Sequence, residues 1–378
     1  MSSLSRRLDA AWHQAVIKNQ IINEFEAAWA DPSGSWAKGD RIAYGVKYIE
    51  EQFVYYARNL SQSVDIKGAT AQKYVHSSST QTKYLCRLNS YRALRPGAIK
   101  RSQQHQTDIP ADASRCRFYC QDRTHPLSLL RRSPLLSVPL KHYIWNAYYN
   151  VAPLETTGHF LWIPTQRSDA AQNDAARGGI KPENNTLPHR PQQMTPAIVE
   201  DDVQLFSQLS GQLSSQLFGQ LSTSVLSFNA LQAGASVNHI HFQSIYSHQP
   251  LPIAIARTTE YNGYQLSANY PAQSAIFSPT QPLDTLLLYI EKLQKAYIPF
   301  NLAMLSEKIF VTARTKNNIS LPNFSGEGYA TLEICGAILV TDRAAFEAVT
   351  AALVERALHE TTLPARKIID ALCYGEQR

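Results

Sequence analysis

Residues 234–243 read Gly-Ala-Ser-Val-Asn-His-Ile-His-Phe-Gln, and this stretch decides the expected fold more than any other part of the 378-residue chain. Side chains alternate between the two faces of a β-strand. The stretch therefore predicts a strand with one chemical face and one packing face, behind a turn of small residues. The chemical face would carry Val237, His239, His241, Gln243 and Ile245, and the packing face Ile240 and Phe242.

The two histidines and the glutamine suit the transfer of a phosphoryl group. Imidazole is substantially neutral near pH 7 and can attack phosphorus, so either His239 or His241 can serve as the nucleophile by this argument. Gln243 can donate an amide N–H to a phosphoryl oxygen, but it cannot protonate a leaving group. We therefore expect a leaving group that departs as a stable anion, such as a sugar phosphate. The Gly-Ala-Ser turn at 234–236 offers backbone N–H groups and a hydroxyl, which suit a phosphate cradle.

The same pattern has other interpretations. Two histidines spaced two residues apart on a strand are also typical of metal ligands, or of polar side chains whose hydrogen bonds are satisfied inside the fold. The three residues alone leave these alternatives open.

The composition indicates a folded globular protein. Hydrophobic residues make up 44% of the chain and charged residues 17%, which is unlike a disordered sequence. No apolar run approaches the roughly 20 residues of a membrane helix, and the N-terminal residues lack the apolar stretch of a secretory signal. Five cysteines, an odd number, do not suggest a disulfide framework in a chain of this size. We therefore expect a cytoplasmic protein with no membrane partner.

The charge gives no reason to expect a nucleic-acid partner. The formal net charge is +6, but Lys and Arg are spread along the chain with few dense runs. The densest clusters lie at 92–101 and 131–132, and no zinc-finger, helix-turn-helix or aromatic-basic RNA motif accompanies them. Either cluster is compatible with a phosphorylated small molecule.

The hydrophobic patterns predict an α+β chain. Near the N-terminus we expect helices over 8–29 and 48–60 and a strand over 83–88. A β-hairpin follows over 143–164, closed by Pro164, and then a polar loop at 166–196. Leucines recur every four residues from Leu205 to Leu221, which predicts a helix with one apolar stripe ahead of a strand at 224–229.

A similar order of elements recurs in the last third of the chain. It predicts a helix over 283–297, strands over 301–304, 308–313 and 330–340, and a final helical segment. Because hairpin, loop, helix and strand occur twice, we expect a duplicated α+β unit, although no sequence period is visible. The predicted domains are an N-terminal helical and β extension at 1–110, a catalytic unit at 111–275, and a second, degenerate unit at 276–378 packed on the first.

Two blocks of sequence resemble the signature blocks of the histidine-triad superfamily. The first is the segment Asn-Val-Ala-Pro-Leu-Glu-Thr-Thr-Gly-His-Phe-Leu-Trp-Ile-Pro at 150–164, and the second is 234–243 preceded by Phe228-Asn229. Within the superfamily they are similar to the branch that has Gln in place of the last His. That branch contains galactose-1-phosphate uridylyltransferases, diadenosine tetraphosphate phosphorylases and GDP-hexose phosphorylases. Residues 238–246, 250–252 and 332–336 are most similar to the GDP-hexose enzymes, and the Gly-Ala-Ser turn and 300–302 to the diadenosine enzymes.

The resemblance implies a fold and a role for each site residue. The fold would be a HIT-like antiparallel sheet with flanking helices, duplicated about a pseudo-twofold axis within one chain. His241 would be the nucleophile that becomes nucleotidylated, Gln243 would bind the transferred phosphoryl group, and His239 would orient its neighbour. The residues that would contact phosphate or nucleotide are Asn229, Gly234, Ala235, Ser236 and His159.

The resemblance also implies a reaction. A nucleoside monophosphate would pass from a nucleoside diphosphate sugar, with GDP-hexose favoured, to His241, and inorganic phosphate or a sugar phosphate would then remove it. The alternatives are a diadenosine polyphosphate phosphorylase and a nucleotide-binding protein without catalysis. No cofactor is required for this chemistry, and the chain would act as a monomer or a homodimer.

A structural zinc site is a further implication of the resemblance. Some uridylyltransferases bind zinc through a Cys-x-x-Cys pair and two histidines, whose places here fall at His159 and His239. In this chain the pair is Cys116 and Cys120, with three residues between them, which departs from that pattern but is acceptable zinc spacing in general. Similar pairs in other members bind no metal, so zinc is an alternative to simple packing.

Overall fold

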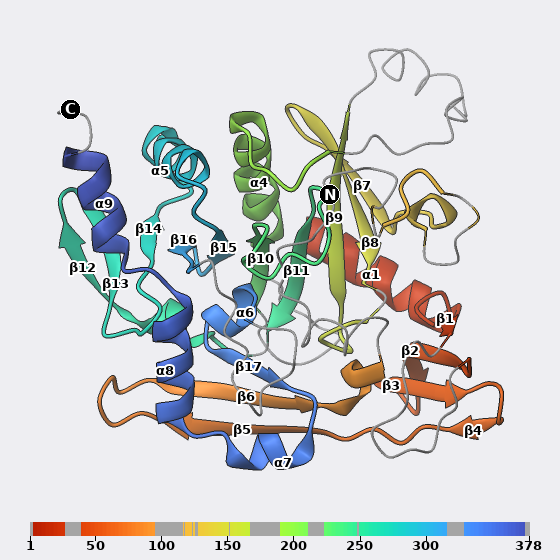
Figure 1. The fold of residues 1–378 in the computed structure, drawn as a ribbon. Coiled ribbons are helices and arrows are strands. Elements are labelled where there is room, and N and C mark those ends of the chain that lie inside the picture. The colour runs from red at the N-terminus through yellow and green to blue at the C-terminus, as the bar shows by residue number, and fades with distance from the viewer. Residues whose placement is uncertain are drawn as a thin grey trace.

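The fold is α+β and is built on one large antiparallel sheet (Figure 1). The computed structural model describes residues 3–26, 39–94, 116, 118–122, 124, 128–150, 152–166, 190–210, 223–247, 249–315 and 329–374. The large sheet has ten strands in the order β12-β13-β14-β16-β15-β10-β11-β9-β8-β7. Their bounds are β7 Leu136–Pro139, β8 Tyr143–Tyr149, β9 His159–Gln166, β10 Thr223–Asn229, β11 Phe242–Ser247, β12 Arg257–Tyr261, β13 Tyr264–Ala268, β14 Ala275–Phe277, β15 Phe300–Leu305 and β16 Lys308–Ala313.

The sheet consists of two halves with the same topology. From its outer edge inward, one half runs β7-β8-β9-β11-β10 and the other runs β12-β13-β14-β16-β15. The halves meet where β10 pairs antiparallel with β15, for example Leu226 with Met304. Helix α4 (Pro196–Leu209) joins β9 to β10, and α5 (Asp284–Lys295) joins β14 to β15, so the helices also correspond. The duplicated unit expected from the sequence is therefore confirmed.

The strand order also bears on how the chain is divided. The two sets of strands separate between residues 247 and 257, whereas the sequence suggested a division at residue 275. Strand order alone does not show which segments fold as units. The domain limits at 110 and 275 therefore stay a prediction.

Helices cover one face of the large sheet. Helices α1 (Leu4–Ile17), α4, α5 and α9 (Ala365–Tyr374) contribute to one core cluster. Trp12, Phe206 and Tyr289 from these helices pack with Phe160 and Phe242 from the sheet, and each of these five side chains is at most 1% exposed. Burial of large aromatic side chains is the main stabilising contribution of such a layer.

The opposite face packs against a small sheet made from both ends of the chain. Strands β5 (Thr70–His76) and β6 (Lys83–Asn89) form a hairpin, and β17 (Ala337–Val340) pairs parallel to β6. In Figure 1 the orange β5 and β6 lie alongside the blue β17 at the bottom of the view. The shared core includes Cys86 of β6, Ile338 of β17 and Phe310 of the large sheet. The N-terminal extension is therefore continuous with the C-terminal strand.

The remaining elements are a second small sheet and several short helices. The sheet has four strands in the order β1-β2-β3-β4. Short helices follow β6, precede β7, follow β11 and lie on both sides of β17 in the chain. The bounds are β1 Asn23–Glu26, β2 Arg41–Ile49, β3 Gln52–Asn59, β4 Val64–Asp65, η1 Ser90–Leu94, η4 Leu129–Arg131, η5 Pro252–Ile255, α6 Thr331–Ile334, α7 Arg343–Ala348 and α8 Ala351–Thr361.

Several sequence-based predictions of elements are wrong. Residues 48–60, expected to be helical, form the hairpin of β2 and β3, which turns at Glu50 and Glu51, both with positive φ. Aromatic and β-branched residues such as Val54 and Tyr55 favour a strand here. The first helix ends at Ile17, and residues 330–340 form α6 and β17 rather than one strand. Pro164 lies inside β9 and does not close it.

Other predictions are confirmed or fall outside the described residues. The hairpin of β8 and β9, strand β10, helix α5 and strands β15 and β16 occur where the sequence predicts them. Most of the polar loop, at 167–189, and the later leucines of the predicted helix, at 211–222, lie outside the described residues. In the described part of the chain, no helix has the length and apolar character needed to cross a membrane.

Candidate active site

The histidine segment enters the large sheet later than the sequence predicts. Strand β11 begins at Phe242, so His239 and His241 lie in the irregular segment that precedes it. The Ile240 N–H donates to the carbonyl of Arg190, 2.8 Å away, instead of to a neighbouring strand. The packing face is as expected, because Ile240 and Phe242 are both buried in the main core.

The ring of His241 is held in one tautomer. Its Nδ1 lies 2.7 Å from the carbonyl oxygen of His239. Because a carbonyl can only accept, Nδ1 carries the hydrogen and Nε2 keeps its lone pair. Burial lowers the pKa of His241 to about 4, so the imidazole is neutral near pH 7. This is the form that a nucleophile requires.

His159 orients the amide of Gln243. The Leu154 N–H donates to Nδ1 of His159 over 3.1 Å, so the hydrogen of the neutral ring is on Nε2. That nitrogen lies 3.0 Å from Oε1 of Gln243 and donates to it. Asn150 Nδ2 approaches the same nitrogen at 3.3 Å, which in this tautomer is a contact between two donors. With Oε1 bound to His159, the Nε2 of Gln243 is the atom that can donate to an anion.

Asn229 connects the two halves of the fold. Its Oδ1 accepts from Asn301 Nδ2 at 2.7 Å, from Thr331 Oγ1 at 2.7 Å and from the Thr331 N–H at 2.9 Å. The oxygen is therefore used within the protein, and only the amide Nδ2 of Asn229 suits the predicted contact with phosphate.

The small-residue turn packs closely against a distant segment. Gly234 has φ of +97°, and a Cβ there would lie 2.9 Å from the Cα of Ala330. Ala235 is buried, whereas Ser236 is partly exposed. The glycine is thus required by backbone conformation and close packing. The predicted phosphate contacts of 234–236 stay a prediction.

Two cysteines and a histidine gather beside the His241 ring. The donor atoms of Cys116, Cys120 and His239 all lie within 4.8 Å of one another, and all three residues are buried. A hydrogen bond from Cys120, with His239 as a further cause, lowers the pKa of Cys116, which favours the thiolate that binds metals. Phe118 contacts the rings of both His239 and His241 edge-on. His159 does not join this group, because its ring nitrogens contact Leu154 and Gln243.

Gln192 is a site residue that the sequence did not reveal. Its Oε1 accepts from the His241 N–H at 2.9 Å, and its Nε2 donates to the carbonyls of Asn229 and His241. The Gln192 N–H also donates to Asn238 Oδ1. This side chain fixes the backbone on both sides of the small-residue turn. It belongs to the polar stretch 166–196, where nothing distinguishes it from its neighbours.

Comparison with known proteins gives a local likeness to one plant enzyme. The chain is 38% identical over 87 residues to GDP-L-galactose phosphorylase 1 of Arabidopsis thaliana, which is 20% of each protein. The chain resembles the histidine-triad phosphorylases. No family model matches it. The match thus spans about a fifth of the length of the plant phosphorylase.

Solved structures of a second phosphorylase are also similar to this chain. Yeast Ap4A phosphorylase Apa2 in complex with Ap4A is 15% identical, with a TM-score of 0.48, and the match covers 78% of this chain and 90% of that one. Apa2 without that ligand gives a TM-score of 0.49 with the same coverage.

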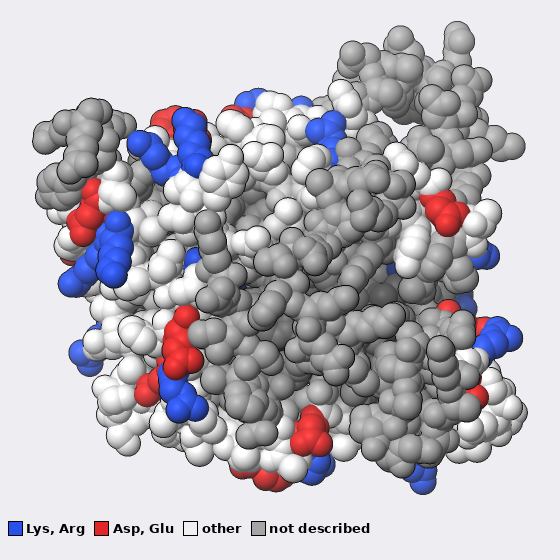
Figure 2. All heavy atoms as spheres, in the orientation of Figure 1, with Lys and Arg blue, Asp and Glu red and all other residues white. Residues whose placement is uncertain are grey.

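The charged side chains of the described residues are interspersed on the surface. Figure 2 shows Lys and Arg beside Asp and Glu in small groups on the face in view. Ion pairs such as Lys141 with Glu200 and Arg343 with Glu347 fit this pattern. The polar groups that contact Gln243 and Asn229 are instead imidazole, amide and hydroxyl groups, which suit a small ligand held by directional hydrogen bonds.

Proposed function

We propose that this protein is a nucleotidyltransferase of the phosphorylase type that acts on a nucleoside diphosphate sugar, with GDP-hexose favoured. The observation that carries the proposal is the His241 ring, whose Nδ1–H is committed to the His239 carbonyl so that Nε2 is available for attack. The local likeness to the plant phosphorylase supports the same class of substrate.

The proposed reaction has two steps. In the first, Nε2 of His241 attacks the phosphorus of the nucleoside monophosphate group, and the P–O bond to the sugar phosphate breaks with its electrons leaving on that oxygen. The Nε2 of Gln243 donates to a phosphoryl oxygen and stabilises its charge. In the second, inorganic phosphate attacks the same phosphorus, the P–N bond breaks, and His241 returns with a nucleoside diphosphate released.

A diadenosine polyphosphate phosphorylase is the second candidate. The Gly-Ala-Ser turn and the Phe300-Asn301-Leu302 segment favour it, since both are similar to the diadenosine enzymes. The chemistry at His241 would be the same, and the leaving group would be a nucleotide instead of a sugar phosphate. A nucleotide-binding protein without catalysis would need no nucleophile with a free Nε2.

We also propose that Cys116, Cys120 and His239 hold a structural zinc ion. Two thiol groups and an imidazole are ligands that zinc prefers, and their donor atoms are already gathered. When bound, zinc would fix the 116–120 segment against His239. The described residues supply three ligands, since His159 is engaged with Leu154 and Gln243.

A substrate panel with intact-protein mass spectrometry tests the proposed function. The protein is incubated with GDP-hexose, UDP-hexose or diadenosine tetraphosphate, first without phosphate to trap an adduct and then with phosphate to measure turnover. We expect a mass increase of one nucleoside monophosphate, released by phosphate, and none in His241→Asn. Absence of both adduct and turnover with every substrate would support the binding protein instead.

A further inference from the structure

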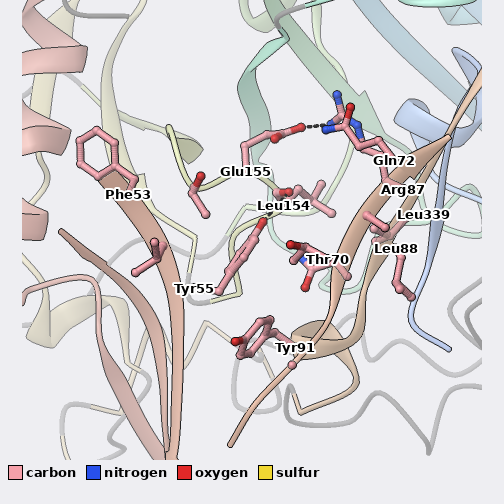
Figure 3. A pocket seen from close by; sticks show the side chains of 15 residues that line it. Phe53, Tyr55, Thr70, Gln72, Arg87, Leu88, Tyr91, Leu154, Glu155 and Leu339 are labelled. Carbon is pink, nitrogen blue, oxygen red and sulfur yellow. Dashed lines mark hydrogen bonds and ion pairs between the residues drawn. The ribbon is translucent and has the colours of Figure 1, made fainter. Parts of the chain in front are cut away.

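A cavity of about 390 Å³ lies between the N-terminal strands and the loop that leads into β9 (Figure 3). Its walls come from β3, β5 and β6, from Leu339 of β17, and from residues 154–156. The volume is large enough for a small organic molecule. None of the residues assigned to the proposed chemistry lines it.

Asn89 gives this cavity an unused pair of polar atoms. The side chain lines the cavity and is 3% exposed, and neither its Oδ1 nor its Nδ2 has a hydrogen-bond partner in the described part of the chain. The Nε of Arg87, in the same wall, is also unsatisfied. A buried polar group without a partner is destabilising. These atoms therefore suit a ligand that presents a donor and an acceptor side by side.

Aromatic side chains form a second wall of the cavity. The rings of Tyr55 and Tyr91 are stacked, with centroids 5.4 Å apart and 24° between the planes. The Tyr55 hydroxyl donates to the Leu154 carbonyl at 2.8 Å, which holds the ring in place. Burial raises the pKa of the Tyr55 hydroxyl, which therefore stays protonated near pH 7 and can donate. A flat ligand can lie against such a wall.

An ion pair supplies charge of both signs beside these groups. Arg87 and Glu155 form a salt bridge at the cavity, which Figure 3 shows as a dashed line. Both side chains are largely buried, with 13% and 16% of their surfaces exposed. The lining thus offers an amide, a guanidinium and a carboxylate around an aromatic wall.

We propose that this cavity binds a nucleobase. A planar base presents donors and acceptors along one edge, and Asn89 can pair with that edge through both amide atoms. Leu154 connects the cavity to the proposed active site, because its carbonyl binds Tyr55 and its N–H binds His159. That this base belongs to the nucleotide transferred to His241 rests on the proposed function. That the cavity binds a base does not.

The Asn89 amide can pair with either guanine or adenine. Guanine offers N–H donors beside its O6 acceptor, which match Oδ1 and Nδ2 of Asn89, and it can also use Glu155 and Arg87. Adenine offers its amino donor and a ring-nitrogen acceptor to the same amide. Tighter binding of guanosine than of adenosine would identify guanine as the base that the cavity binds. Tighter binding of adenosine would identify adenine.

Calorimetric titration of guanosine and adenosine into the full-length protein tests the proposal. Nucleosides without phosphate probe the base site alone. We expect wild-type protein to bind one of them and Asn89→Leu to bind it about tenfold more weakly or worse. Gln265→Leu removes an exposed amide on β13 and is the matched control, which should bind as wild type. Thermal unfolding checks folding, and Asn89→Leu should not lower the midpoint, because it removes unsatisfied polar atoms.

The outcomes separate this proposal from the proposed function. Failure of both nucleosides to bind wild-type protein, or unchanged binding by folded Asn89→Leu, overturns the cavity proposal. Binding that depends on Asn89 without any adduct on His241 supports the cavity and contradicts the transferase. Turnover with the same kcat/KM in wild type and Asn89→Leu supports the transferase and overturns the cavity as its base site.

Discussion

His159 and Gln243 are joined by a hydrogen bond of 3.0 Å between Nε2 of the histidine and Oε1 of the glutamine. The two residues come from the adjacent strands β9 and β11. The bond sets the direction of the glutamine amide, so His159 would act on the proposed reaction through Gln243 and is a positioning residue.

Substitution of either partner should slow the proposed transfer. Gln243→Leu removes the donor to the phosphoryl oxygen, and we expect kcat to fall about 10²-fold or more. His159→Phe should have a smaller effect, and the double variant should resemble Gln243→Leu alone, because His159 acts through the amide. Steady-state kinetics measures kcat for each variant. If the fall in kcat of the double variant equals the product of the two single falls, His159 does not act through Gln243.

Zinc content gives a prediction for Cys116, Cys120 and His239. We expect metal analysis to find about one zinc per chain in protein purified without chelator, and Cys116→Ser to lose most of it. Removal of the metal should lower the unfolding midpoint. Cys86→Ala changes a buried cysteine of another core cluster and should keep its metal. Equal zinc content in Cys116→Ser and wild type would exclude this site.

Gly234→Ala should destabilise the fold. The added Cβ would lie 2.9 Å from the Cα of Ala330, and the φ of +97° is unfavourable for alanine. We expect a loss of about 1–3 kcal/mol in the free energy of unfolding by urea. Gly263→Ala is the control, since it has φ of +79° but no atom within 4 Å of the added carbon. A loss no greater than that of the control would show that close packing at Gly234 is unimportant.

Asp202 in α4 predicts a dependence of stability on pH. Burial, with Asp201 as a second cause, raises the pKa of this carboxyl well above 3.8, and neither oxygen has a hydrogen-bond partner in the described residues. The folded state therefore keeps a proton that the unfolded state releases, and stability falls as pH rises above about 3.8. Asp202→Leu should stabilise the protein by about 1–3 kcal/mol at pH 8 and by less at pH 4. Urea unfolding at both pH values measures this, and an equal effect at each would contradict it.

Local patterns allowed much of the fold to be predicted. The β8–β9 hairpin, β10, α5 and β16 follow from the alternation and periodicity of apolar residues in single stretches of sequence. The 48–60 segment was predicted wrongly, because its apolar residues are compatible with both periods and its pairing with 41–49 decides the structure. Segment 237–241 was also misassigned, since contacts from residues 190 and 192 replace strand pairing there.

The sequence by itself determined which residues are available for chemistry. These are two histidines, a glutamine and a small-residue turn at fixed spacing in residues 234–243, and the second block at residues 150–164. The tertiary structure decided how they are used. The direction of Gln243 and the clamp formed by Gln192 depend on hydrogen-bond partners that are distant in the chain. Hydrogen bonds between such partners form only when folding brings them within about 3 Å, and no local pattern encodes that distance.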